Sequence, residues 1–346
     1  PLPKPGSKND RGTYLYDKLE NSRVRCRTCS QFCVLEPGRR GKCGVRENQD
    51  GRLMALNYGK IIAHGVDPIE KKPIYHLKPG SRSYSIATMG CNFTCRFCQN
   101  ADNAQISRDS DTRIAGRSMS PEQIVDNAVA AGCQSIAYTY TEPSIFFELA
   151  YDTARLARNT GLFNVFVTNG YMSPDLVHQA VPYLDAANVD LKAFDDEFYK
   201  TYCNARLAPV KENLKRLKQA GVWVEVTTLV IPGLNDHPEE LRALARFIAQ
   251  ELGCDTPWHV SRFHPTHQMR DREPTPADTV ETAWQIGKDA GLQYVYVGNL
   301  PGSSHQHTHC PDCDARVVER QGYATLNHMK ENGVCPGCGT RISGIY

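Results

Sequence analysis

Residues 83–100 read SYSIATMGCNFTCRFCQN and contain the two features that decide the fold. The first six residues, 83–88, are mostly β-branched, aromatic or small, which is typical of a strand. Three thiols follow at CxxxCxxC spacing, at Cys91, Cys95 and Cys98. Because barrel enzymes build their sites at the carboxyl ends of parallel strands, this position predicts a functional loop at the mouth of an α/β barrel.

Six further strand-like segments follow as far as residue 299, with amphipathic helical stretches between them. They are residues 135–140, 163–169, 187–192, 222–231, 258–263 and 294–299. Three of the intervening helices begin with capping signals, Ser120, Ser173 and His237, each directly before a proline. Seven strands separated by helices predict parallel pairing with right-handed crossovers. The predicted fold is therefore α/β, a partial (β/α) barrel, since a full barrel needs one more unit.

Composition and charge exclude several other classes of protein. The chain has 346 residues, of which 40% are hydrophobic and 23% charged, as in ordinary globular proteins. It has no apolar run long enough for a transmembrane helix. Lys plus Arg is 40 against 38 for Asp plus Glu, so nothing favours a broad electrostatic grip on nucleic acid or membrane. Because no secretory segment is visible and thiols are abundant, we expect a cytoplasmic location.

Eleven of the fourteen cysteines fall into three tight groups, a pattern that suits metals better than disulfides. The groups are Cys26, Cys29, Cys33 and Cys43; Cys91, Cys95 and Cys98; and Cys310, Cys313, Cys335 and Cys338. The remaining Cys133, Cys203 and Cys254 are isolated, and we interpret them as ordinary buried residues.

The middle group, Cys91, Cys95 and Cys98, with the aromatic Phe97 before its last thiol, resembles the signature of the radical S-adenosylmethionine (SAM) superfamily. Three protein ligands on a four-iron cubane leave one iron open for a cofactor or substrate. The resemblance implies that SAM binds this iron and is reductively cleaved to methionine and a 5′-deoxyadenosyl radical, which abstracts hydrogen from a substrate. The alternative is a structural zinc knuckle with a fourth ligand elsewhere.

Two strand ends resemble SAM-binding segments of activases for formate lyase. Residues 140–143, YTEP, resemble a Gly-Gly-Glu-Pro segment, which implies that Glu142 accepts hydrogen bonds from the SAM ammonium group. In this chain Tyr140 and Thr141 stand in place of the two glycines. Residues 168–170, TNG, resemble the end of an Asp-Thr-Asn-Gly segment, which implies SAM-site roles for Thr168 and Asn169.

Two charged segments have open interpretations. Residues 190–192, DLK, match the Asp-Leu-Lys of the same family, which implies that Asp190 and Lys192 lie near the SAM carboxylate and ribose. The alternative is a charge pair at a strand end. Residues 67–73, DPIEKKP, precede the barrel. Either their charged side chains contact substrate or SAM, or the segment is a solvated linker.

The motifs as a set resemble one branch of the superfamily, the radical SAM proteins of the AmmeMemoRadiSam system. The segments that carry the resemblance are Cys26–Cys29, Pro37–Arg46, Asp67–Pro73, Ser85–Thr88, Tyr138–Pro143 and the C-terminal cysteine pairs. It implies a barrel similar to that of pyruvate formate-lyase activase and an electron donor such as flavodoxin or ferredoxin. It also implies Memo-like and AMMECR-like pathway partners, but it does not identify the substrate.

The two flanking thiol groups predict small metal sites at either end of the barrel. The C-terminal pairs, CPDC and CPGC, are typical of a structural zinc ribbon, with an auxiliary iron–sulfur cluster as the alternative. The N-terminal group suits zinc or an auxiliary cluster on ligand type. A tight turn at Pro37-Gly38 favours zinc there. We therefore expect an N-terminal metal knuckle in residues 1–82, the barrel in 83–299 and a zinc-ribbon-like module in 300–346.

Other functions remain open at this stage. The leading hypothesis is a radical SAM enzyme, and the alternatives are a zinc-dependent nucleic-acid-binding protein, a radical enzyme acting on RNA, or an enzyme that activates a protein glycyl radical. Near-neutral charge counts against the nucleic-acid-binding protein. His264 and His267 lie beyond the sixth strand and are candidates for proton transfer at the barrel mouth.

Overall fold

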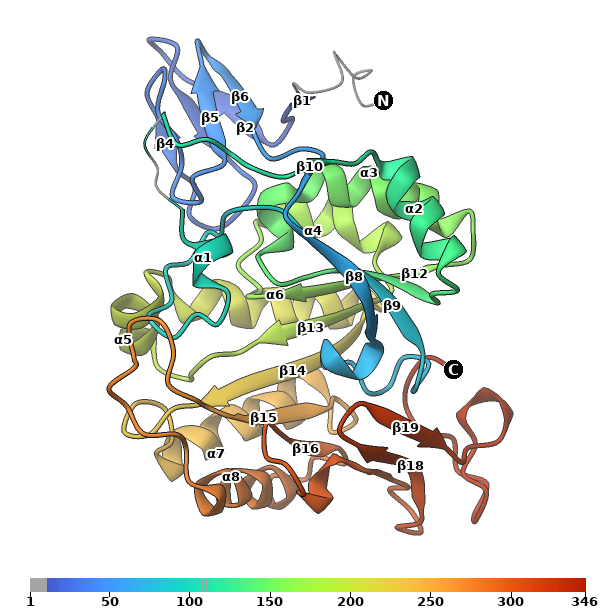
Figure 1. Ribbon diagram of the computed structural model, residues 1–346. Coiled ribbons are helices and arrows are strands. Elements are labelled where there is room, and N and C mark those ends of the chain that lie inside the picture. The colour runs from blue at the N-terminus through green and yellow to red at the C-terminus, as the bar shows by residue number, and fades with distance from the viewer. Residues whose placement is uncertain (1–10, 107–108, 110) are drawn as a thin grey trace.

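The computed structural model describes residues 11–106, 109 and 111–346, and an open eight-stranded sheet forms its centre (Figure 1). Seven neighbouring strands run parallel. In sheet order they are β9 Arg82–Ala87, β11 Ser135–Tyr138, β12 Phe163–Thr168, β13 Ala186–Asp190, β14 Trp223–Val230, β15 Trp258–Arg262 and β16 Val295–Gly298. Each overlaps one predicted strand, so the partial α/β barrel is confirmed.

Helices connect the parallel strands and begin where the capping signals predict. The longer ones are α2 Pro121–Ala130, α3 Phe147–Arg158, α4 Pro174–Ala180, α6 Leu207–Gln219, α7 Pro238–Phe247 and α8 Ala277–Asp289. Ser120 caps α2 in a full capping box, and Ser173 and His237 accept backbone N–H groups at the starts of α4 and α7. Local side-chain chemistry therefore sets these three helix starts.

The two faces of the sheet are covered by different parts of the chain. Side chains such as Ile136 and Phe166 belong to the main core with the helices. The residues adjacent to these in the same strands, Ala137 and Val165, pack instead against Ile69 and neighbouring apolar residues before β9. Because side chains alternate between the faces of a strand, the segment before β9 fills the base of the barrel interior.

One strand of the central sheet was not predicted. Strand β8, Ala63–Pro68, pairs antiparallel with β9 at the edge of the sheet and leads into the single turn η1, Ile69–Lys71. Its sequence, AHGVDP, contains glycine and proline, which are poor strand formers. Proline is tolerated on an edge strand because one side of that strand makes no ladder bonds.

Small antiparallel sheets flank the barrel at both ends of the chain (Figure 1). The N-terminal ones contain β1 Arg11–Gly12, β2 Tyr16–Lys18, β3 Val24–Cys26, β4 Val34–Leu35, β5 Arg46–Gln49 and β6 Arg52–Ala55. The C-terminal one contains β17 Thr308–His309, β18 Arg316–Gln321 and β19 Ala324–Asn327. Leu77 forms a β-bridge with Ile345, which joins the end of the chain to the segment inside the barrel. The three-part domain division stays a prediction.

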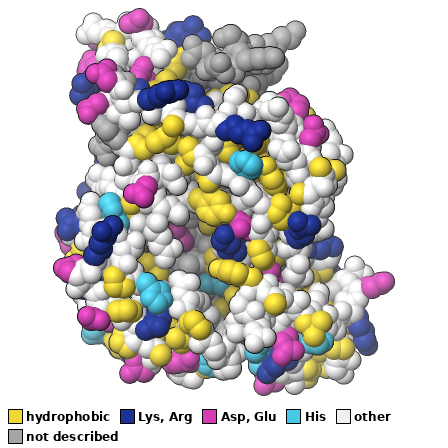
Figure 2. All heavy atoms as spheres, viewed as in Figure 1, with side chains coloured by type: hydrophobic (Ala, Val, Ile, Leu, Met, Phe, Trp, Pro, Cys, Tyr) yellow, Lys and Arg dark blue, Asp and Glu magenta, His cyan; other side chains and the backbone are white. Residues whose placement is uncertain are grey.

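The surface agrees with the near-neutral charge. On the face in Figure 2, Lys and Arg are interspersed with Asp and Glu rather than gathered in one patch. Within the described residues, every helix is too short or too polar to cross a membrane.

Candidate functional site at the barrel mouth

The three-cysteine loop leaves the carboxyl end of β9, as its sequence position predicts. Its backbone is held by the turn Tyr199–Cys203: Thr94 N–H donates to the Cys203 carbonyl at 3.1 Å, and Arg96 N–H donates to the Tyr202 carbonyl at 3.0 Å. The Cys95 thiol is buried, and those of Cys91 and Cys98 are partly buried. The loop is therefore fixed by contacts remote in sequence, as a ligand loop must be.

Gly90, directly before Cys91, shows how closely this loop packs against the N-terminal region. Its φ of +99° lies in the region that favours glycine. A Cβ atom there would lie 2.6 Å from the Cys43 carbonyl oxygen and 2.9 Å from a methyl of Val45. A side chain at position 90 would force the two segments apart, so glycine is required here.

Glu142 follows β11 and is almost fully buried, with 1% of its surface exposed. Its carboxylate accepts three hydrogen bonds, from Ser144 N–H at 3.0 Å, the Thr168 hydroxyl at 2.8 Å and Asn169 N–H at 2.8 Å. Burial raises the pKa of Glu142, and these three donors oppose that shift. A carboxylate has about four acceptor positions, so one is left for a further donor.

Asn169 connects Glu142 to the three-cysteine loop. Its backbone N–H binds Glu142, and its side-chain amide donates to the Asn92 side-chain oxygen at 2.7 Å. The same amide nitrogen lies 3.8 Å from the Cys91 sulfur. The predicted residues Thr168 and Asn169 are therefore brought together with Glu142 and Cys91 in one polar network.

Asp190 and Lys192 lie at the end of β13 and form an ion pair, with Nζ 2.9 Å from the Asp190 carboxylate. Burial tends to lower the pKa of Lys192, but Asp190 and the nearby thiols of Cys95 and Cys203 outweigh it and raise that pKa well above its usual range. The same ammonium group lies 5.7 Å from the centre of the buried Phe97 ring. This pair thus belongs to the loop's surroundings.

Comparisons with known proteins agree with this geometry. The family model of the radical SAM superfamily matches residues 85–248. An uncharacterized protein of Methanocaldococcus jannaschii is 43% identical over 334 residues, which are 96% of this chain and 98% of that protein. The chain belongs to the radical SAM superfamily.

Two more distantly similar proteins have named activities. The pyruvate formate-lyase-activating enzyme of Clostridium pasteurianum is 22% identical over 176 residues, 49% of this chain and 70% of that enzyme. A radical SAM methyltransferase structure from Sphaerobacter thermophilus superposes with a TM-score of 0.50 at 16% identity, over 64% of this chain and 67% of that chain. The latter supports the fold alone.

Membership of the radical SAM superfamily implies a 4Fe–4S cluster and SAM. The donor set of the loop fits such a cluster, because its CxxxCxxC motif offers three thiols. The thiols are also more widely spaced than zinc ligands, since Cys91, Cys95 and Cys98 are not among the described groups whose ligand atoms all lie within 4.8 Å of one another.

Tyr140 and Thr141 stand where the Gly-Gly-Glu-Pro segment that they resemble has two glycines, and the backbone at Tyr140 is unusual for a residue with a side chain. Tyr140 has a φ of +62°, which glycine adopts freely and other residues rarely do. Its phenol donates a hydrogen bond to the Asp67 carboxylate, and its ring lies 5.2 Å from the Lys72 ammonium group. This tertiary contact stabilises the unfavourable backbone conformation.

The burial of Asp67 and Lys72 decides against one of the two interpretations of segment 67–73. Asp67, Glu70 and Lys72 are 9%, 2% and 3% exposed, so a solvated linker is wrong for them. The Lys72 ammonium group donates to the Asp67 carboxylate at 2.6 Å, inside the barrel next to Tyr140. Charged residues buried at this position belong to the site's surroundings.

Two of the isolated cysteines depart from the sequence-based interpretation. Cys254 is exposed, so its predicted burial is wrong, whereas Cys133 and Cys203 are buried as expected. Cys203 is not isolated in space, because its thiol hydrogen-bonds to Cys95 and this bond lowers the pKa of Cys95. No sequence motif marks Cys203; it reaches the loop through the contacts of residues 199–203.

One of the two candidate histidines, His267, belongs to a turn beside the same loop. The turn at residues 266–269 contacts it, since Gln268 N–H donates to the Arg96 carbonyl at 3.0 Å. Among the described residues, the buried Nε2 atom of His267 has no hydrogen-bond partner. His264 is exposed. Of the two, only His267 is therefore placed in a turn that contacts the loop, partly buried and with its Nε2 atom shielded from solvent.

The four C-terminal thiols form a compact group that could bind a metal ion. Their sulfur atoms all lie within 4.8 Å of one another, with 3.5 Å between Cys310 and Cys338 and 3.7 Å between Cys313 and Cys335. A tetrahedral ion with metal–sulfur bonds of about 2.3 Å places its sulfurs about 3.8 Å apart. The geometry fits a single metal ion.

Proposed function

We propose that this chain uses Cys91, Cys95 and Cys98 to hold a 4Fe–4S cluster that cleaves SAM and starts radical chemistry on a protein substrate. One electron from the reduced cluster breaks a carbon–sulfur bond of SAM, giving methionine and a 5′-deoxyadenosyl radical that takes a hydrogen atom from the substrate. The observation that carries the proposal is the network from Glu142 through Asn169 to the Cys91 loop.

The surrounding residues have separate roles in this proposal. Glu142 accepts a hydrogen bond from the SAM ammonium group at its remaining acceptor position, while Thr168 and Asn169 fix the direction of its carboxylate. Asp190 and Lys192 bind the SAM carboxylate and ribose. Phe97 and the other buried side chains of the loop exclude water, which strengthens these charge-assisted bonds.

The substrate class rests on the relatives. The activating enzyme of Clostridium pasteurianum is named for a protein target, pyruvate formate-lyase. We infer that this chain likewise acts on a protein, with formation of a glycyl radical as the simplest reaction, and takes its electron from flavodoxin or ferredoxin. Its motifs further support membership of the AmmeMemoRadiSam system, with Memo-like and AMMECR-like proteins as partners. Superfamily membership favours an enzyme over a zinc-dependent nucleic-acid-binding protein.

The C-terminal module is proposed as a structural zinc site. The sulfur–sulfur distances of 3.5 and 3.7 Å support zinc at Cys310, Cys313, Cys335 and Cys338, because they match a tetrahedron around one ion. Each pair lies on a tight turn, closed by Cys310 N–H to the Ala315 carbonyl and by Cys335 N–H to the Thr340 carbonyl. Four protein ligands leave no open position, so this site has no catalytic role.

The proposed reaction is tested by anaerobic reconstitution with iron, sulfide, SAM and dithionite, followed by chromatography for 5′-deoxyadenosine. The wild-type chain should form this product, and the triple variant C91A/C95A/C98A should form none. Cys254→Ala, which removes an exposed thiol, is the matched control and should retain activity. If the triple variant cleaves SAM, or if wild type loaded with iron does not, the proposal is wrong.

A further inference from the structure

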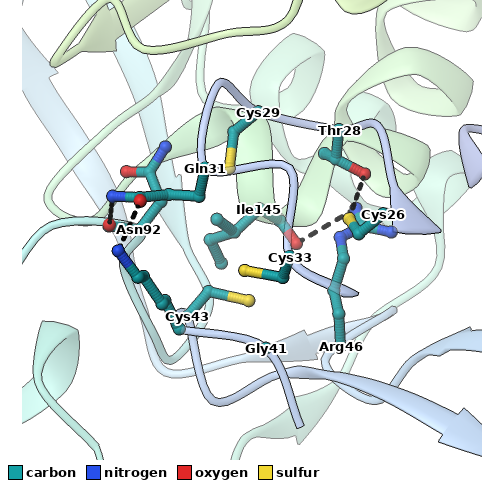
Figure 3. Close-up of a pocket in the computed structure, with 11 residues that line it drawn as sticks. Cys26, Thr28, Cys29, Gln31, Cys33, Gly41, Cys43, Arg46, Asn92 and Ile145 are labelled. Carbon is teal, nitrogen blue, oxygen red and sulfur yellow. Dashed lines mark hydrogen bonds between the residues drawn. The ribbon is translucent and has the colours of Figure 1, made fainter. Parts of the chain in front are cut away.

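A second group of thiols surrounds a pocket that the proposed reaction does not use. Cys26, Cys29, Cys33 and Cys43 all line this pocket of about 310 Å³, part of which is open to solvent (Figure 3). Three of the four, all but Cys33, are buried. The thiols come from the end of β3, the turn after it and the loop before β5, so the fold gathers both halves of the motif around one space.

The spacing of these thiols differs from that of the C-terminal group. In residues 11–346, apart from the undescribed 107–108 and 110, the C-terminal thiols are the one group whose ligand atoms all approach within 4.8 Å. The N-terminal thiols therefore lie farther apart, as those of the three-cysteine loop do. A cubane binds each cysteine sulfur to a different iron, whereas zinc binds all four to one ion. The wider arrangement favours the cubane.

Arg46 provides a second, independent sign of a bound group. It lines the pocket and is 1% exposed. Its two Nη atoms bind the Glu148 carboxylate at 2.9 and 2.6 Å, but its buried Nε has no hydrogen-bond partner among the described residues. A buried donor without a partner is rare in folded proteins. A thiolate or an inorganic sulfide in the pocket would accept this N–H, and such bonds are known to tune iron–sulfur clusters.

Other polar groups around the pocket suit a negatively charged cluster. The Lys42 ammonium group also lines it and donates to the Gln31 side chain at 2.8 Å. The hydroxyl of Thr28 lies 3.4 Å from the Cys26 sulfur, where it can donate to a thiolate. A four-iron cluster bound by four thiolates carries a net negative charge. The charge of Arg46 is already balanced by Glu148, so the Lys42 ammonium group is the cation that offsets part of the cluster's charge.

We propose that Cys26, Cys29, Cys33 and Cys43 bind a second four-iron cluster, in which every iron has a protein ligand. This second cluster is not part of the proposed function. It takes the place of the zinc ion that the Pro37-Gly38 turn favours on sequence grounds. That turn is present, with Arg39 N–H donating to the Glu36 carbonyl at 3.1 Å, but it does not draw the sulfurs together.

The position of this cluster indicates its chemistry. With no open iron it would not bind SAM or substrate, which leaves one-electron transfer or a structural role. The Gln31 side chain donates to the Asn92 carbonyl at 3.0 Å, and Asn92 directly follows Cys91. The close contact of Gly90 with the Cys43 carbonyl joins the same two segments. The segments that would hold the two clusters are therefore in direct contact through the backbone of the three-cysteine loop.

The test uses the full chain, prepared anaerobically and reconstituted with iron and sulfide, with metals and labile sulfide counted per chain. In C91A/C95A/C98A the second site should retain about four irons and about four sulfides and give an electron paramagnetic resonance signal after reduction by dithionite. Adding C29A/C33A should remove both the iron and the signal. Cys254→Ala is the control and should leave the metal content unchanged.

Wild-type totals keep the test decisive where a variant does not fold. About eight irons per chain, all retained in Cys335→Ser, support the second cluster, whereas about four irons together with two zinc ions per chain would overturn it. Failure here is distinct from failure of the proposed function, because SAM cleavage by wild type is measured separately. A chain with one cluster that still forms 5′-deoxyadenosine would refute only the inference about the N-terminal site.

Discussion

Replacement of Glu142 by glutamine tests the SAM site most directly. The change keeps the shape of the side chain but removes its charge. In wild type the carboxylate already accepts hydrogen bonds from Ser144, Thr168 and Asn169, which leaves one acceptor position for the SAM ammonium group. If the amide oxygen keeps the bonds from Ser144 and Thr168, the new NH₂ group faces the N–H of Asn169, and two donors then oppose each other.

The magnitude follows from the loss of the bond to the ammonium group. A hydrogen bond to a charged group contributes about 1.5–3 kcal/mol, so SAM affinity should fall about 10- to 150-fold in Glu142→Gln. The assay is anaerobic titration calorimetry on samples matched in iron content. Thermal unfolding of the same samples separates weaker binding from a loss of folded protein.

Asp185→Asn is the matched control for this experiment. Asp185 is a partly buried carboxylate that also accepts a backbone hydrogen bond, from Asn164 N–H at 2.7 Å, and burial raises its pKa too. It lies directly before β13, at the opposite end of the sheet from Glu142. The control should bind SAM as wild type does. A Kd for Glu142→Gln that matches wild type would refute the role assigned to Glu142.

Three further predictions concern the scaffold. Cys335→Ser should expose residues 300–346 to rapid proteolysis while the barrel keeps its iron, because zinc binding in such modules contributes about 10–16 kcal/mol. Loss of iron in this variant would instead identify an iron–sulfur cluster at the C-terminal thiols. Burial lowers the pKa of His76 to about 4. As the pH falls, the unfolded chain therefore takes up this proton before the folded chain does, so the stability should be full above about pH 6.5 and should decrease towards pH 4. An unchanged pH dependence of Tm in His76→Asn would contradict this. Tyr140→Phe removes the hydrogen bond to Asp67 and should cost about 1.5–3 kcal/mol in denaturant unfolding, whereas the exposed Tyr323→Phe should cost nothing measurable.

The parts of the fold that the sequence predicts are those set by local chemistry. The seven parallel strands and the helix starts at Ser120, Ser173 and His237 depend on side chains within a few residues of one another. Strand β8 was missed because its glycine and proline are unfavourable locally, and only pairing with β9 makes it a strand. Tertiary context outweighs intrinsic preference at that edge.

Contacts between distant residues account for what the sequence could not predict at the site. Cys203 lies 108 positions after Cys95 in the numbering, and Arg46 lies 102 positions before its partner Glu148. Neither pair forms a motif. Glu142 was singled out because residues 140–143 resemble a known SAM-binding segment, whereas a partner that arrives from another part of the chain leaves no local pattern.

The three thiol groups show why cysteine spacing alone does not identify a metal. The N-terminal and C-terminal groups both begin with a CxxC pair and both contain four thiols. Spacing of this kind fixes the turn that presents two sulfurs, but the distance to the other two depends on what packs between the turns. At the C-terminus the two turns meet directly and bring the sulfurs together. At the N-terminus a pocket that Arg46 and Ile145 also line lies among the thiols, and the sulfurs stay apart. The packing between the turns, and therefore the tertiary structure, selects between one metal ion and a cluster.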